Sequence, residues 1–175
     1  MKKMLFVWLV CTSMGVSSQV LTNDQWLENV STIDRTLETL YDVISGEKGE
    51  KRNWELFKYL FKPEARLIPS GKNKEGDIGL SYLTIDDYIK ASGEWLEQNG
   101  FFEVEIHRST QSFGNITQVF STYESYYSQN DVKPFMRGIN SIQLLNDGKR
   151  WWVVNIYWAN ETEGTPIPDQ YLPKN

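Results

Sequence analysis

Apolar residues recur at helical spacing through the first part of the chain. Between Asp24 and Ser45 they fall every three or four positions, so the segment predicts a helix with one apolar face. The residues of that face are Val30, Ile33, Leu37, Leu40, Tyr41 and Ile44. A polar, glycine-containing loop over 46–52 separates this helix from the next element.

A short aromatic helix is expected to begin after Asn53, which is a favourable N-cap, and to end at Pro63. The stretch ARLIP (65–69) predicts a short strand. The following residues, 70–79, are rich in glycine and lysine and predict a flexible connector.

Thr84 and Asp87 have the spacing of a capping box, so a third helix is expected to start there and to stop at Gly100. From Phe101 onward the apolar period changes from about 3.6 to two, which is typical of strands. We expect an antiparallel meander over 101–112, 116–127, 134–145 and 149–158. Helices followed by a long meander predict an α+β fold, with three N-terminal helices packed on the sheet.

The last hairpin has two candidate registers. A two-residue turn at Asp147-Gly148 would place Asn140 opposite Asn155, whereas a three-residue loop over 146–148 would place it opposite Val154. We favour the second register because it separates an apolar face from a more polar one. The apolar face would hold Gly138, Asn140, Ile142, Leu144, Trp152, Val154, Ile156 and Trp158. Asn140 is then the polar exception on the buried face.

A buried amide without partners is costly, so Asn140 has two interpretations. Either a neighbouring side chain, a backbone group or a water satisfies it, or it points into a cavity and binds a ligand. If Gly114-Asn115 forms a two-residue turn, the preceding hairpin shares a face made of Val104, Ile106, Arg108, Val119, Ser121 and Tyr123. Arg108 and Tyr123 would then converge with Asn140.

The chain begins with two lysines, an apolar run and small residues, which predicts a signal peptide over 1–18. We expect one domain over 19–160, a weakly ordered extended tail over 161–175, and a periplasmic or secreted protein that does not contact a membrane after cleavage. Cleavage would remove Cys11 and two lysines, leaving 16 basic and 23 acidic residues and a formal net charge of −7. A cysteine-free acidic domain excludes disulfides and cysteine chemistry, and it argues against nucleic acid as a partner.

Two quoted stretches carry a resemblance that spans about residues 24–160. They are NWELFKYLFKPEARLIP (53–69) and GINSIQLLNDGKRWWVVNIYW (138–158), and with the order of elements they resemble the nuclear transport factor 2-like superfamily. That superfamily has a cystatin-like fold and includes the SnoaL-like and ketosteroid isomerase-like proteins. The resemblance implies a strongly curved mixed or antiparallel sheet that forms a cone around an internal pocket. It also implies a homodimer through the outer face of the sheet, where Trp151 and Tyr157 would be exposed.

The superfamily's catalytic residues map poorly onto this chain. The carboxylate base of the ketosteroid isomerase pattern falls on Pro69, and the protonated acid that supports the oxyanion falls on Asn140. The dehydratase pattern needs two histidines, but the sequence has only His107. His107 shares parity with Glu103 and Glu105, which suggests that all three face solvent. These departures favour a protein that is not an enzyme without deciding the point.

Other chemistries lack their ligands or motifs. His107 and Glu105 have no third residue at metal-ligand spacing, so neither a metal nor a cofactor is expected. The remaining carboxylates near the expected pocket are Asp34, Asp42 and Glu64, and their ordinary interpretation is solvated surface or capping. An enzyme would need one carboxylate to be buried.

We therefore expect an exported binding domain that holds a small apolar or amphipathic molecule. Two alternatives stay open: an isomerase or lyase acting on a cyclic substrate, and a non-catalytic dimeric interaction module. The candidate pocket residues are Tyr41, Trp54, Phe57, Arg108, Tyr123, Asn140, Trp152 and Trp158.

Overall fold

The computed structural model of the chain describes residues 24–174. The expected signal peptide, 1–18, lies outside the described residues and stays a prediction. Within 24–174, none of the helices combines the length and apolar character needed to cross a bilayer.

The predicted first helix is shorter than expected. Two 3-10 turns, Asp24–Trp26 (η1) and Glu28–Val30 (η2), precede helix α1, which spans Ile33–Ile44. Thr32 separates them because its backbone is extended and its hydroxyl accepts a hydrogen bond from the Arg35 amide, at 3.1 Å. A threonine that caps the next helix cannot also continue the preceding one.

The second and third helices begin where the sequence places them. Asn53 caps α2 (Trp54–Tyr59), and Thr84 with Asp87 forms the capping box of α3 (Ile85–Asn99). Gly100 follows α3 with a φ of 76°, and a Cβ there would lie 2.5 Å from the Tyr127 carbonyl oxygen. Glycine is therefore required at this position.

The sheet has six strands rather than five. They are β1 (Phe61–Lys72), β2 (Ile78–Leu80), β3 (Phe102–Phe113), β4 (Ile116–Tyr126), β5 (Met136–Asn146) and β6 (Trp151–Asn160), in the order β2-β1-β6-β5-β4-β3. Strand β1 pairs in parallel with β6, and the other pairs are antiparallel. Pro63, expected to end α2, instead lies within β1, and part of the expected connector forms the β1–β2 hairpin.

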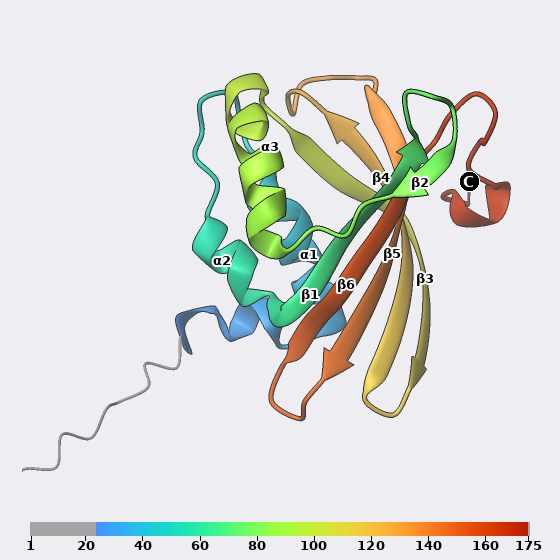
Figure 1. The fold of residues 1–175 in the computed structure, drawn as a ribbon. Coiled ribbons are helices and arrows are strands. Elements are labelled where there is room, and N and C mark those ends of the chain that lie inside the picture. Colours follow the sequence, from blue (N-terminus) through green and yellow to red (C-terminus); the bar gives the residue numbers. More distant parts are fainter. Residues whose placement is uncertain (1–23, 175) are drawn as a thin grey trace, which may run out of the picture.

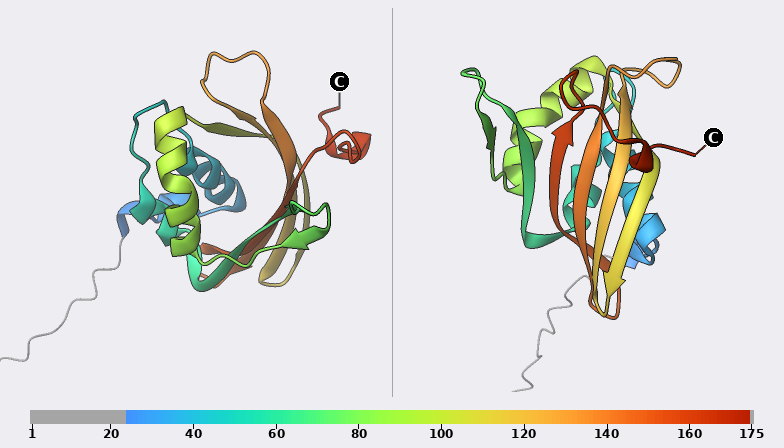
Figure 2. Two further views of the ribbon diagram at one scale, coloured as in Figure 1. Left: turned by 45° about the horizontal axis from the view of Figure 1, so that its top comes forward. Right: turned by 90° about the vertical axis from the view of Figure 1, so that its right-hand side faces the viewer.

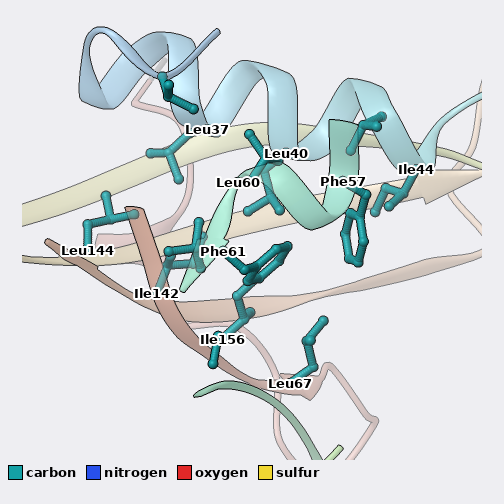
Figure 3. Packing of buried hydrophobic residues seen from close by; sticks show 14 of the residues in the cluster. Leu37, Leu40, Ile44, Phe57, Leu60, Phe61, Leu67, Ile142, Leu144 and Ile156 are labelled. Carbon is teal, nitrogen blue, oxygen red and sulfur yellow. The ribbon is translucent and has the colours of Figure 1, made fainter. Parts of the chain in front are cut away.

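The sheet curves around the helices, which all lie on its concave side (Figures 1 and 2). Figure 3 shows side chains of α1, α2 and the inner sheet face meeting in one apolar cluster. Its members include Leu37, Leu40, Phe57, Leu60, Ile142 and Leu144. The α+β class and the curved mixed sheet are confirmed, and the helices cover one mouth of an open cone.

A β-bulge in β3 reverses the predicted facing of its first half. The two-residue turn at Gly114-Asn115 sets the register up to His107, but the register shifts by one residue between His107 and Glu105. Because side chains alternate along a strand, this shift turns Glu105 and Glu103 inward. Val104, predicted to face inward, is 50% exposed.

A second irregularity makes both proposed registers of the last hairpin wrong. Asn140 pairs with Trp158, because the connection is a four-residue loop over 147–150 and the register shifts again between Gln143 and Leu144. The inward-facing residues of β6 are consequently Val153 before the shift and Ile156 after it, three positions apart instead of two. Val154, expected inside, is 38% exposed, and Trp151, expected outside, packs against the core. The prediction that Asn140 is buried is correct.

The C-terminal tail covers part of the outer sheet face (Figure 2). The Tyr171 ring lies edge-on to Phe120, at 4.9 Å between centroids, and the Tyr171 carbonyl accepts a hydrogen bond from the Thr122 hydroxyl, at 2.7 Å. Ile167 is 8% exposed. The tail is therefore packed against the domain, with a short 3-10 turn at Asp169–Tyr171 (η3).

Replacing Ile167 by alanine should lower the free energy of unfolding by roughly 2 kcal/mol, since a buried aliphatic side chain loses its packing. A denaturant titration measures the change. Val132→Ala is the control, because Val132 is 92% exposed and its truncation should change stability by less than about 0.5 kcal/mol. Equal stabilities of the two variants would show that the tail does not pack in solution.

Candidate functional site

A cavity of about 220 Å³ lies between the helices and the inner face of the sheet. Seven of its sixteen lining residues are aromatic, and the only ionisable carboxyl group among them is that of Glu103. Trp95 lines the cavity and is 43% exposed, so the cavity reaches the surface beside α3. The lining residues are Leu40, Tyr41, Ile44, Phe57, Leu67, Tyr88, Ser92, Trp95, Leu96, Phe101, Glu103, Tyr123, Met136, Asn140, Ile156 and Trp158.

The polar groups gather at one end of the cavity. The Asn140 amide nitrogen donates to the Tyr41 hydroxyl oxygen, at 3.2 Å, and to the Glu103 carboxylate, at 3.3 Å. The Ser125 hydroxyl donates to the other carboxylate oxygen of Glu103, at 3.2 Å. Asn140 therefore joins the helix α1 to the strand β3 through the inner face of β5.

A chain of hydrogen bonds leads from this end of the cavity to Glu105, and each group in it donates to the next one. Arg108 pairs with Glu105 and with Asp34, so the Glu105 carboxylate acts only as an acceptor. The Ser121 hydroxyl donates to Glu105 and must accept from the Tyr41 hydroxyl, which lies 2.6 Å away. The Tyr41 hydroxyl in turn accepts from Asn140.

Burial raises the pKa of Glu103 to about 7, against the opposing effect of the hydrogen bonds from Asn140 and Ser125. No cationic side chain lines the cavity to stabilise the ionised form. Burial, and secondarily the negative charge of Glu103, also raises the pKa values of the Tyr41, Tyr88 and Tyr123 phenols. These phenols therefore stay neutral at physiological pH, and Glu103 is the group that titrates in the cavity.

Five of the eight candidate pocket residues line the cavity: Tyr41, Phe57, Tyr123, Asn140 and Trp158. Three do not. Trp54 packs edge-on to Phe57, with its ring next to Gly93 of α3, and does not line the cavity. Arg108 is held by Glu105 and Asp34.

Trp152, the third, donates its indole N–H to Asp147, at 2.7 Å, and lies beneath the cationic ends of Lys62 and Arg150. The register shift in β6 explains its position, because Trp152 falls on the opposite face from Val153 and Ile156. Trp152 therefore stabilises the β5–β6 loop.

Glu103 is the residue that the sequence failed to identify. It alternates with Phe102 and Val104 along the strand, so its parity predicts a solvent-facing side chain. Only the bulge turns it inward, and the sequence carries no clear signal of that bulge. Pro69, His107, Asp34, Asp42 and Glu64 are all absent from the cavity lining.

Among residues 24–174, no three histidine, cysteine, aspartate or glutamate side chains are grouped as metal ligands would be. The Tyr41, Asn140 and Glu103 groups have the chemistry to orient an organic ligand or to exchange a proton with it.

The sequence matches no protein-family profile. It also matches no curated protein.

Solved structures share the fold at low sequence identity. A Nostoc punctiforme protein of unknown function with a cystatin-like fold is 9% identical, with a TM-score of 0.54 over 77% of this chain and 96% of its own. An NTF-2 like protein of unknown function from Silicibacter pomeroyi is 14% identical, with a TM-score of 0.52 over 80% of this chain and 98% of its own. An uncharacterized cystatin-like protein from Caulobacter vibrioides is 10% identical, with a TM-score of 0.53 over 75% and 89%.

The protein is thus an α+β domain whose curved sheet and helices surround a cavity lined mainly by aromatic and aliphatic side chains. Its fold is the nuclear transport factor 2-like, cystatin-like fold, as the resemblance in the sequence implied.

Glu103→Gln should change how stability depends on pH. In the wild-type protein a carboxyl group with a raised pKa contributes stability that is fully present below about pH 4.5 and is lost as pH rises to about 7. Glutamine cannot ionise, so above pH 7 the variant should be more stable by about 1–3 kcal/mol. Denaturant titrations from pH 4 to 8 measure this difference.

The control for that experiment is Glu94→Gln on the exposed face of α3, which should leave the pH dependence unchanged. A Glu103→Gln variant whose stability falls with pH as steeply as that of the wild type would contradict a raised pKa.

Asn140→Leu should destabilise the fold by roughly 1–3 kcal/mol near neutral pH, because it removes a donor from the buried Tyr41 hydroxyl and from the partly buried Glu103 carboxylate. The matched control is Asn155→Leu on the outer face of β6, expected within about 0.5 kcal/mol of wild type. Unfolding in denaturant measures both variants. A stable Asn140→Leu protein would mean that the amide serves a ligand and not the fold.

Proposed function

We propose that this protein is a nuclear transport factor 2-like binding domain whose cavity holds a small, largely apolar molecule. The observation that carries the proposal is the composition of the cavity wall: aromatic and aliphatic side chains on most sides and a few hydrogen-bonding groups at one end. Such a wall removes apolar surface of a ligand from water, while the polar end orients it. Export of the protein is part of the proposal and is supported by the pattern of residues 1–18.

Assembly as a homodimer through the outer sheet face also belongs to the proposal. Phe113, Ile116, Val154 and Tyr157 leave apolar surface exposed on that side, which supports an interface there. The packed tail covers the other end of the same face, beside Tyr157, so a partner would contact Phe113, Ile116 and Val154 near the β3–β4 turn.

A second candidate function is catalysis by an isomerase or lyase on a cyclic substrate. The position of Glu103 favours it, because a buried carboxylate with a pKa of about 7 can take up and release a proton at neutral pH. The hydrogen bonds oppose it. The Tyr41 hydroxyl and the Asn140 amide already donate within the protein, so neither is free to stabilise an oxyanion.

Small ring compounds such as 2-phenylethanol and cyclohexanone should cause saturable shifts in the NMR signals of the Trp95 and Trp158 indole N–H groups, which report on the cavity. Ser92→Trp should abolish the shifts, because Ser92 lines the cavity and a tryptophan there fills it. Ala91→Trp is the matched control on the exposed face of the same helix and should bind as wild type does.

Binding in the cavity would be refuted if the NMR shifts did not saturate, were spread over surface residues, and had the same size in Ser92→Trp and Ala91→Trp. The same cyclohexanone samples in deuterium oxide test the second candidate. Exchange of the hydrogens next to the carbonyl, faster than in buffer and lost in Glu103→Gln, would establish catalysis.

A further inference from the structure

The polar end of the cavity offers hydrogen-bond acceptors, whereas the Asn140 amide and the Tyr41 hydroxyl already donate within the protein. Both amide hydrogens of Asn140 are directed to acceptors, one to the Tyr41 oxygen and one to Glu103. The Tyr41 hydroxyl hydrogen is directed to Ser121. Among residues 24–174, no group donates a hydrogen bond to the Asn140 side-chain oxygen. In the same part of the chain, the fully buried side-chain atom without a hydrogen-bond partner is His107 Nδ1, so the Asn140 oxygen retains some accessible surface. It is therefore available to a ligand.

The orientation of the Asn140 amide follows from its partners. Glu103, when ionised, can only accept, and the Tyr41 oxygen must accept because its hydrogen is committed to Ser121. A flipped amide would bring its oxygen against both of these acceptors. The side-chain oxygen of Asn140 is thus left without a donor from the described residues, and it and the Glu103 carboxylate are the two acceptors of this end.

The charge of the cavity also favours a ligand that donates hydrogen bonds and carries a positive charge. No lysine, arginine or histidine lines it, so an anionic ligand would meet Glu103 without any compensating charge. The surrounding wall holds the rings of Tyr41, Tyr88, Tyr123 and Trp158, and aromatic faces attract cations. A neutral wall of hydrocarbon alone would give no such preference.

We propose that the ligand is an apolar amine, bound as its ammonium ion with the N–H groups directed to Glu103 and the Asn140 side-chain oxygen. This inference rests on the proposed function, since it names the chemical class of the molecule that occupies the same cavity. The apolar part of the amine fills the aromatic wall, and the charged end supplies the counter-ion that the buried carboxylate lacks.

Amine binding then depends on the ionisation of Glu103. The groups that face Glu103 are the Tyr41, Tyr88 and Tyr123 phenols, which stay neutral, and the Asn140 and Ser125 side chains. On its other side Glu103 borders a polar groove lined also by Asp42, Glu50 and Asp131. None of these neighbours is cationic, so the ligand's ammonium group is the natural partner of the carboxylate.

Isothermal titration of the full-length protein with 2-phenylethylamine and 2-phenylethanol at pH 6, 7 and 8 tests the inference. An alkyl ammonium stays protonated over this range, whereas the ionised fraction of Glu103 rises from about one tenth to about nine tenths. The amine should therefore bind about tenfold more tightly at pH 8 than at pH 6. The alcohol, which carries the same ring and arm without the charge, should bind equally at each pH.

Glu103→Gln should remove both the pH dependence of amine binding and the preference for the amine at pH 8. His107→Gln is the control, because His107 is the only histidine in the sequence and is absent from the cavity lining. Equal affinities of amine and alcohol at pH 8 would overturn the inference while leaving the proposed function standing. Binding of neither probe would overturn both.

Discussion

The inward turn of Glu103 is the constraint on which the cavity depends. It results from one extra residue in β3, near Ile106, which shifts the pairing with β4 and exchanges the two faces of the strand. Without that bulge, Val104 would face inward, and the cavity would be apolar at the end where it now carries a carboxylate. Bulges are common where a strand must redirect a side chain next to a functional site.

Once Glu103 is inside, the neighbouring polar residues have to satisfy it. A buried carboxylate costs several kcal/mol unless hydrogen bonds compensate. Asn140 and Ser125 provide two such bonds from β5 and β4, and Tyr41 provides the second partner of the Asn140 amide from α1. This explains the amide in the middle of the otherwise apolar inner face of β5. Asn140 connects helix and sheet, and it also lines the cavity.

The sequence predicts the parts of the fold that depend on local rules. The N-caps of α2 and α3, the stop at Gly100 and the burial of Asn140 follow from residue type and periodicity. The facing of Glu103 and Trp152 does not, because both lie beyond a register shift set by pairing with another strand. A strict period of two carries no information about an inserted residue, so each shift reverses all predictions beyond it. The tail is a similar case, since its packing depends on Phe120 and Thr122, which are about fifty residues away.

The same hydrogen bonds that stabilise the cavity restrict its chemistry. The Asn140 amide and the Tyr41 hydroxyl are directed to other protein groups, so the oxygens of Glu103 and Asn140 are left to receive a donor from a ligand. A protonated Glu103 can donate a hydrogen bond to a carbonyl compound, whereas an ionised Glu103 can accept one from an ammonium ion. Because burial keeps the pKa of Glu103 near neutrality, small changes of pH select between these two classes of molecule. Above pH 7 the ionised form predominates, and the acceptor oxygens of Glu103 and Asn140 then favour the amine.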